Sequence, residues 1–111
     1  MQSELEEALL FQLRAVGLPL PVVQYRAIPG RRWRWDFAWP ERKLLVEVQG
    51  GIWIKSGHTT GTGISRDIEK NNAAVLAGWR VLFVTACMIE DGRALEVIEA
   101  MLQDGGDRLD E

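Results

Sequence analysis

The sequence contains very little of the two side chains that most often bind transition metals. Cys87 and His58 are the only cysteine and the only histidine in 111 residues. Disulfides, thiolate zinc sites and centres built from several imidazoles are therefore excluded. Cys87 belongs to the apolar run 81–88, where we expect a small buried thiol. Any metal chemistry must rest on carboxylates.

Long apolar runs are also missing. No stretch approaches the roughly 18 uninterrupted apolar residues that a membrane span needs. The N-terminus opens with the acidic segment 3–7 rather than with a basic, apolar signal peptide. We therefore expect a soluble, cytoplasmic protein with no membrane partner. The length fits a single domain at residues 1–103, followed by an acidic C-terminal tail at 104–111.

Positive charge is scarce overall but is concentrated in the middle of the chain. The formal net charge is −3, yet residues 26–80 carry ten cations against five acids, so that both ends are acidic. Acidic ends are common in soluble proteins. A solvated surface therefore explains the pattern as well as a nucleic-acid partner does.

Hydrophobic periodicity predicts the order helix, three strands, helix, strand, helix. Ser3 and Glu6 are placed as a capping box at the start of the first helix, which we expect at 3–16. The expected strands are 22–26, 32–39, 43–49 and 79–85, and the later helices are 64–77 and 90–103. A helical connection makes the last two strands parallel. The sequence thus predicts an α/β or α+β domain with a central mixed four-stranded sheet flanked by helices.

The second and third strands are expected to form a hairpin with its tip at 41–42, which pairs residues whose numbers sum to 83. The expected pairs are Trp39–Leu44, Ala38–Leu45, Phe37–Val46, Asp36–Glu47, Trp35–Val48 and Arg34–Gln49. Strict alternation places Trp33, Trp35, Phe37 and Trp39 on one face of the strand. A slip of one residue would set an aromatic side chain opposite Glu47, so the pattern favours this register.

Asp36 and Glu47 form a candidate metal site on this hairpin. Directly opposed Cβ atoms lie about 4.5–5.5 Å apart. Two unit charges about 5 Å apart cost roughly 3 kcal/mol at an effective dielectric of about 20. A hard divalent cation removes this cost, and oxygen ligands alone favour Mg²⁺ or Mn²⁺. The alternative is that Arg32 or Arg34 neutralises the pair as part of a surface charge cluster.

Asp36, followed by Glu47-Val48-Gln49 on the next strand, resembles the PD-(D/E)XK nuclease superfamily, with Gln49 in place of the usual lysine. Three further stretches resemble small phage and bacterial endonuclease domains related to the very-short-patch repair endonuclease: Phe37–Pro40, Val46–Gly51 and Gly78–Val81. The resemblance covers roughly residues 3–85. It implies a restriction-endonuclease-like fold.

The resemblance also implies an activity, namely metal-dependent hydrolysis of phosphodiester bonds in DNA by a nickase or a structure-specific endonuclease. Asp36, Glu47 and the backbone carbonyl of Val48 would hold Mg²⁺ or Mn²⁺, with water as the nucleophile. Gln49 can orient that water, but it has neither a positive charge nor a titratable proton. Either glutamine suffices, or a cation from elsewhere supplies the charge.

Lys70, on the helix expected at 64–77, is the first candidate for the missing charge. On that helix we expect Ile64, Ile68 and Val75 to form the buried stripe, with Lys70 on its flank. An ordinary solvated lysine fits this position as well. The direction of Asn71 falls in the stripe, so its amide needs either a backbone carbonyl or a contact near the site.

Other candidates surround the same centre. Glu6 could add a carboxylate to the metal shell, as a helix glutamate does in many members of the superfamily, or act only in the capping box. Arg32 and Arg34 share a strand face with Asp36 and could neutralise phosphates. The Gly- and Thr-rich segment 50–63 includes the stretch 57–63, which could wrap a phosphate or be a plain surface loop. It carries two candidate nucleic-acid contacts, Lys55 and His58.

The leading interpretation is a DNA endonuclease from a phage or a mobile element. The alternative is a nuclease-fold nucleic-acid-binding module that Gln49 has weakened as a catalyst. A third possibility is an acidic α/β interaction domain with affinity for neither metal nor nucleic acid. The small surface suggests a homodimer or a larger nucleoprotein partner.

Overall fold

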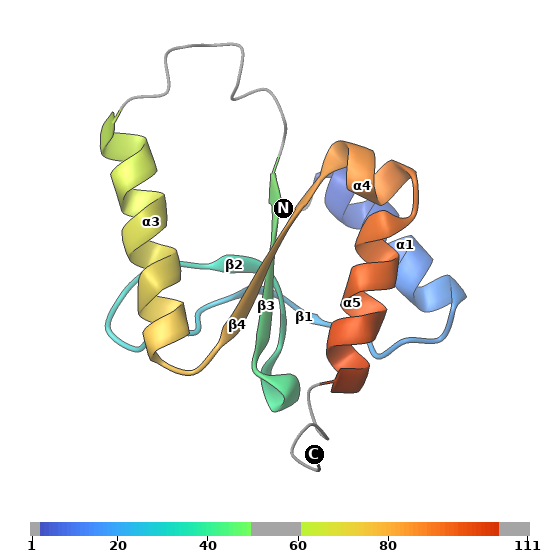
Figure 1. The fold of residues 1–111 in the computed structure, drawn as a ribbon, viewed down its shortest axis with the longest axis horizontal. Coiled ribbons are helices and arrows are strands. Elements are labelled where there is room, and N and C mark those ends of the chain that lie inside the picture. Colours follow the sequence, from blue (N-terminus) through green and yellow to red (C-terminus); the bar gives the residue numbers. More distant parts are fainter. Residues whose placement is uncertain (1–2, 50–60, 105–111) are drawn as a thin grey trace.

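A computed structural model describes residues 3–49 and 61–104 of the chain. A four-stranded mixed sheet lies at its centre with helices on both faces, as the sequence predicts (Figure 1). In chain order the elements are α1 (Glu4–Ala15), β1 (Val22–Tyr25), β2 (Trp35–Trp39), the 3₁₀ turn η1 (Pro40–Arg42), β3 (Leu44–Gln49), α3 (Gly61–Leu76), β4 (Arg80–Thr85), α4 (Ala86–Glu90) and α5 (Arg93–Asp104). No helix in the described part of the chain is long and apolar enough to cross a membrane.

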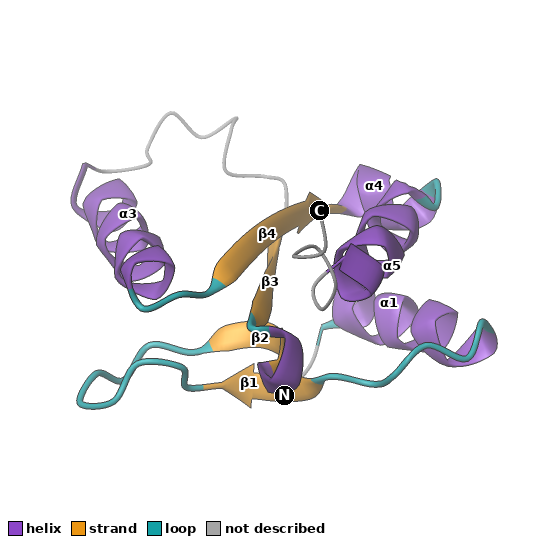
Figure 2. Ribbon diagram, turned by 60° about the horizontal axis from the view of Figure 1, so that its bottom comes forward, coloured by secondary structure: helices purple, strands orange, loops and turns teal. Residues whose placement is uncertain are grey.

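The strand order in the sheet is β1-β2-β3-β4. The first three strands are antiparallel neighbours, whereas β3 and β4 run parallel. The connection through α3 makes this parallel pairing possible and places α3 on one face of the sheet. Helices α1, α4 and α5 lie together on the other face (Figure 2). The predicted mixed topology is therefore confirmed.

The predicted hairpin register is confirmed for the three residue pairs next to the turn, and the pairing stops before it reaches Asp36 and Glu47. The three pairs whose numbers sum to 83 are Phe37–Val46, Ala38–Leu45 and Trp39–Leu44. Within residues 3–49 the backbone ladder of β2 and β3 includes no further pair, because the Val48 amide donates to Asp36 Oδ2 at 2.8 Å. The predicted strand also begins late, at Trp35, so Arg32 and Arg34 precede it.

Two apolar clusters pack on opposite faces of the sheet. The cluster beneath α1, α4 and α5 includes Phe37, Trp39 and Val46, and the smaller cluster beneath α3 includes Trp35, Ala38 and Leu45. Strict alternation wrongly placed Trp35 with Phe37. The ladder between β2 and β3 stops at Phe37, whereas Trp35 still pairs with Tyr25 of β1 and packs beneath α3.

Helix α3 presents a different face to the sheet from the predicted one. It begins three residues before the expected start, at Gly61. Ile68 is 55% exposed and Val75 is 58% exposed, while Ala74 is buried. The expected buried stripe is therefore wrong at Ile68 and Val75. The helix is rotated about its axis so that polar side chains face the sheet: Asn71 accepts the Trp35 indole N–H at 3.0 Å.

The C-terminal region contains two helices where one was expected at 90–103. Helix α4 ends near Gly92, which has φ +89°, a conformation that favours glycine. The Thr85 hydroxyl caps α4 by accepting the Met88 N–H at 3.2 Å. The last residues of the apolar run 81–88 therefore belong to helix α4. Within this helix Cys87 is exposed, whereas the sequence predicted a buried thiol. At the N-terminus, Ser3 Oγ accepts the Glu6 N–H at 3.1 Å, as the capping box predicts.

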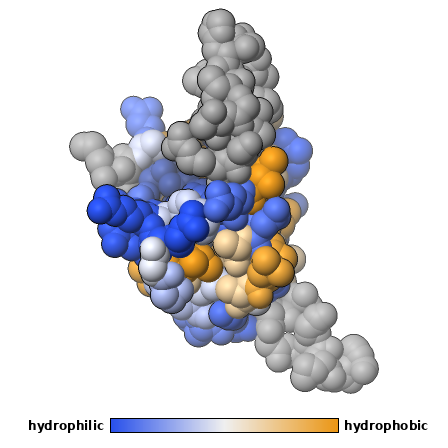
Figure 3. Space-filling model, turned by 90° about the vertical axis from the view of Figure 1, so that its left-hand side faces the viewer, coloured by the Kyte–Doolittle hydropathy of each residue, from blue (hydrophilic) through white to orange (hydrophobic). Residues whose placement is uncertain are grey.

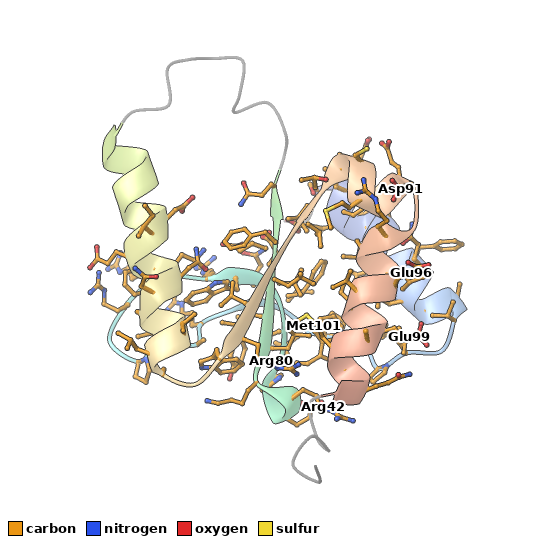
Figure 4. The ribbon with its side chains drawn as sticks, in the orientation of Figure 1. Arg42, Arg80, Asp91, Glu96, Glu99 and Met101 are labelled. Atoms are coloured by element: carbon orange, nitrogen blue, oxygen red, sulfur yellow. The ribbon has the colours of Figure 1, made fainter. Side chains whose placement is uncertain are left out.

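The sheet end where β3 and β4 begin is held together by Arg80. Its guanidinium donates to the carbonyls of Arg42 and Met101, each at 3.0 Å, and so joins η1, β4 and α5 (Figure 4). Nearby, Lys43 Nζ lies 4.4 Å from the centroid of the Trp79 ring. Both cations thus have partners at this end.

Candidate functional site

The opposite end of the sheet brings Asp36 of β2 beside Glu47 of β3. Asp36 Oδ2 accepts the Val48 N–H at 2.8 Å, and the Asp36 N–H faces Glu47 Oε1 at 3.4 Å. Both side chains are half-buried. The two carboxylates that the sequence predicts to converge therefore lie on adjacent strands at one point of the sheet.

Lys70 of α3 reaches this pair from above the sheet. Its Nζ forms an ion pair with Glu47 Oε2, and the two side chains are only 13% and 15% exposed. The same ammonium lies 4.8 Å from the centroid of the Trp35 ring. Lys70 is therefore not an ordinary solvated helix lysine.

Two acidic groups at this end, Glu47 and Glu6, have pKa values raised above those of free side chains. Burial raises the pKa of Glu47 to about 7, although Lys70 opposes this shift and the Asp36 charge adds to it. Burial and then the nearby Asp36 carboxylate also raise the pKa of Glu6. Asp36 thus stands between Glu6 of α1 and Glu47, which links three acids across two layers of the fold.

These residues fit a hard divalent cation by their chemistry. The donors are carboxylate oxygens, and Glu6 Oε1 is buried with no hydrogen-bond partner in residues 3–49 and 61–104. The Val48 carbonyl points to the same side of β3 as its N–H, and therefore towards Asp36. The described residues contain no group of three or more His, Cys, Asp or Glu side chains arranged around one point. The acids instead meet in pairs through Asp36.

The remaining predicted residues are spread around this centre. Gln49 is half-buried at the end of β3, two residues beyond Glu47 and on the same face of the strand. Arg32 and Arg34 are exposed in the segment before β2. Lys55 and His58 lie outside the described residues.

Two residues of the site were not assigned a role in it from the sequence. Gln24 of β1 has φ +50°, and its amide donates to Asp36 Oδ1 at 3.4 Å. Asn71 satisfies its amide twice, by accepting from Trp35 and by donating to the Asp67 carbonyl at 2.9 Å. Asn71 was identifiable by its polarity on a buried stripe, whereas nothing in the sequence marks Gln24.

The described fold has a counterpart among solved structures. In particular, the fold is similar to the catalytic domain of the homing endonuclease I-Bth0305I, with a TM-score of 0.61, 17% sequence identity and 93% of each chain covered. At this identity the likeness shows the fold alone. It does not test the finer resemblance to very-short-patch repair endonucleases.

Similarity in sequence extends to an uncharacterized protein in each of two strains of Mycobacterium tuberculosis. Each is 34% identical over 68 residues, which cover 60% of this chain and 24% of the relative. The match thus spans about a quarter of the length of these relatives. No family model matches the chain.

Proposed function

We propose that this chain is a divalent-metal-dependent endonuclease that hydrolyses phosphodiester bonds in DNA. The observation that supports it most is the meeting of Asp36, Glu47 and Lys70 at one end of the sheet. Two partly buried carboxylates beside a partly buried ammonium are costly to fold and suited to binding a cation and a phosphate. The endonuclease-like fold supports the same reaction class.

Each residue has a proposed task. Asp36, Glu47 and the Val48 carbonyl would hold Mg²⁺ or Mn²⁺, with Glu6 as an additional carboxylate. When bound, such an ion supplies activation of water and neutralisation of charge on the phosphate. The Gln49 amide would orient the attacking water by hydrogen bonding, because it can both donate and accept.

Lys70 would supply the positive charge that Gln49 lacks. Its ammonium is already held at Glu47, beneath α3 and against the Trp35 ring. A cation fixed in a partly buried site stabilises developing charge more strongly than one in water. The charge that the superfamily usually takes from the third strand would thus come from a neighbouring helix.

The test is cleavage of supercoiled plasmid DNA in Mg²⁺ or Mn²⁺, with EDTA as the metal-free control. Asp36→Asn keeps an oxygen that can accept the Val48 N–H and removes the negative charge, so the fold should survive. We expect the wild type to nick the plasmid only with metal, and Asp36→Asn to lower the rate at least about 100-fold. The matched control is Asp91→Asn, at an exposed site outside this centre, which should cleave like the wild type.

The alternative is a nucleic-acid-binding module with this fold and without cleavage. One observation favours it, since Lys70 already neutralises one oxygen of Glu47. A module would bind DNA equally well in EDTA and would leave the plasmid intact even in Mn²⁺. That result would overturn the proposed enzyme.

A further inference from the structure

A pocket of about 240 Å³ lies between α3 and β4. Five side chains line it: Asp67, Ile68, Asn71, Asn72 and Phe83. Figure 3 views the molecule from the side of α3, where apolar side chains lie among hydrophilic ones. The four α3 residues have the spacing of one helix face. They therefore form one continuous wall of the pocket, and Phe83 forms the opposite wall.

The pocket adjoins the carboxylate centre. Phe83 is the register partner of Glu47 on the parallel neighbour strand. Two residues earlier, Leu45 and Val81 both pack in the cluster beneath α3, so Glu47 and Phe83 face α3 as well. On the helix side, Asn71 of the pocket follows Lys70 directly. A ligand in the pocket would therefore lie next to whatever ion or phosphate is bound at Glu47 and Lys70.

The lining suits a flat ring with a polar edge. Phe83 is 42% exposed and Ile68 is 55% exposed, which offers an aromatic face and an aliphatic wall. Asn72 and Asp67 are exposed and add an amide and a carboxylate. Small-molecule sites usually measure about 300–1,000 Å³, so this smaller pocket fits one ring system rather than a whole nucleotide.

We propose that the pocket binds one unpaired nucleobase of the DNA strand next to the phosphate that is cut. The base would stack on Phe83, since aromatic side chains stack with any base. The Asp67 carboxylate accepts hydrogen bonds only, so it favours a base with an exocyclic amino group (adenine, cytosine or guanine) over thymine, whose unpaired edge offers N3–H as its single donor. This inference rests on the proposed function and extends it to a single-stranded or locally unpaired substrate.

The first experiment measures binding of the full chain to fluorescently labelled single-stranded oligonucleotides of dC, dA or dT, with Ca²⁺ in place of Mg²⁺ to limit cleavage. Phe83→Ala should weaken binding of the dC and dA strands about tenfold. The control is Phe11→Ala, because Phe11 is 69% exposed on α1, across the sheet from α3. This variant should bind like the wild type.

Two further variants keep the result interpretable if Phe83→Ala folds poorly. Phe83→Trp should bind as tightly as the wild type, with its added fluorescence quenched by the oligonucleotide. Asp67→Asn should reduce the preference for dC over dT severalfold. Unquenched fluorescence, or equal affinities of Phe83→Ala and Phe11→Ala for every strand, would overturn the base pocket. Plasmid nicking by the wild type in the same preparation would then leave the proposed enzyme standing.

Discussion

The two ends of the central sheet use charged residues in opposite ways. Where β3 and β4 begin, the Arg80 guanidinium is matched to two backbone carbonyls and Lys43 to the Trp79 ring. At the other end, Asp36 lies between two further carboxylates, whose pKa values burial raises. One end therefore satisfies its cations, whereas the other gathers three carboxylates around a single ammonium, that of Lys70.

The difference supports the proposed ligand site at the Asp36 end. A protein that needed only to fold could replace partly buried carboxylates with apolar side chains of similar size at no loss of stability. Perturbed acids in a group are typical of functional sites. The contrast predicts that substitutions at the Arg80 end change stability, and that substitutions at the Asp36 end change activity.

The largest expected effect is on activity at Lys70. Lys70→Met should lower kcat for plasmid cleavage about 100- to 1,000-fold with little change in KM, because the removed charge acts on the transition state. Lys43→Met is a matched control, since each lysine lies over a tryptophan ring, at 4.8 Å for Lys70 and 4.4 Å for Lys43. Equal rates for the two variants would remove Lys70 from the reaction.

The next effect is on stability at the other end. Arg80→Met should lower the free energy of unfolding by about 2 kcal/mol, because the carbonyls of Arg42 and Met101 lose a charged donor. Urea denaturation measures this loss, and calorimetric titration with Mn²⁺ measures metal binding by the folded protein. The Mn²⁺ affinity should stay unchanged. A tenfold weaker affinity would show that the two ends are coupled.

Much of the fold follows from patterns visible in the sequence. The register of the hairpin is set by apolar residues that alternate up to the turn, and the structure keeps it through Phe37–Val46. The helical connection between β3 and β4 predicts their parallel pairing, which the structure also shows. Hydrophobic periodicity and the length of the connections are therefore enough to predict how the strands of the sheet pair.

What the sequence did not predict depends on contacts between distant polar groups. The rotation of α3 follows from the Trp35 N–H and the Glu47 carboxylate, which Asn71 and Lys70 satisfy from 36 and 23 residues away, respectively. The hydrophobic stripe of an isolated helix contains no information about such partners. The same holds for Gln24, whose backbone conformation is visible only in the assembled sheet.

A smaller, pH-dependent effect is expected at Glu47. Its pKa of about 7 in the folded protein exceeds the ordinary 4.5, so the folded state retains a proton that the unfolded state loses. The metal-free wild type should therefore lose stability as the pH rises from about 4.5 to 7. Glu47→Gln, which has no such proton, should be more stable than the wild type at pH 8 by on the order of 1–2 kcal/mol.

Thermal melting in EDTA at several pH values measures this difference. The gap between Glu47→Gln and the wild type should close as the pH falls through 4.5, where Glu47 of the unfolded wild type also becomes protonated. Glu96→Gln, at an exposed position of α5, is the control and should show no such trend (Figure 4). If Glu47→Gln is the less stable protein at pH 8, the ion pair with Lys70 outweighs the cost of burial.

The smallest effect tests whether the backbone strain in β1 belongs to the Asp36 end of the sheet. Gln24 adopts φ +50° while its amide faces Asp36 Oδ1 at 3.4 Å. Glycine accepts this conformation without strain, so Gln24→Gly should fold at least as well as the wild type, yet lose about threefold in kcat/KM with the Asp36 contact. Gln24→Ala loses the same contact but keeps the strain, so it should be equally slow and less stable. Melting curves and initial rates of both variants separate the two contributions. Wild-type rates in both would mean that the conformation of Gln24 serves the sheet and not Asp36.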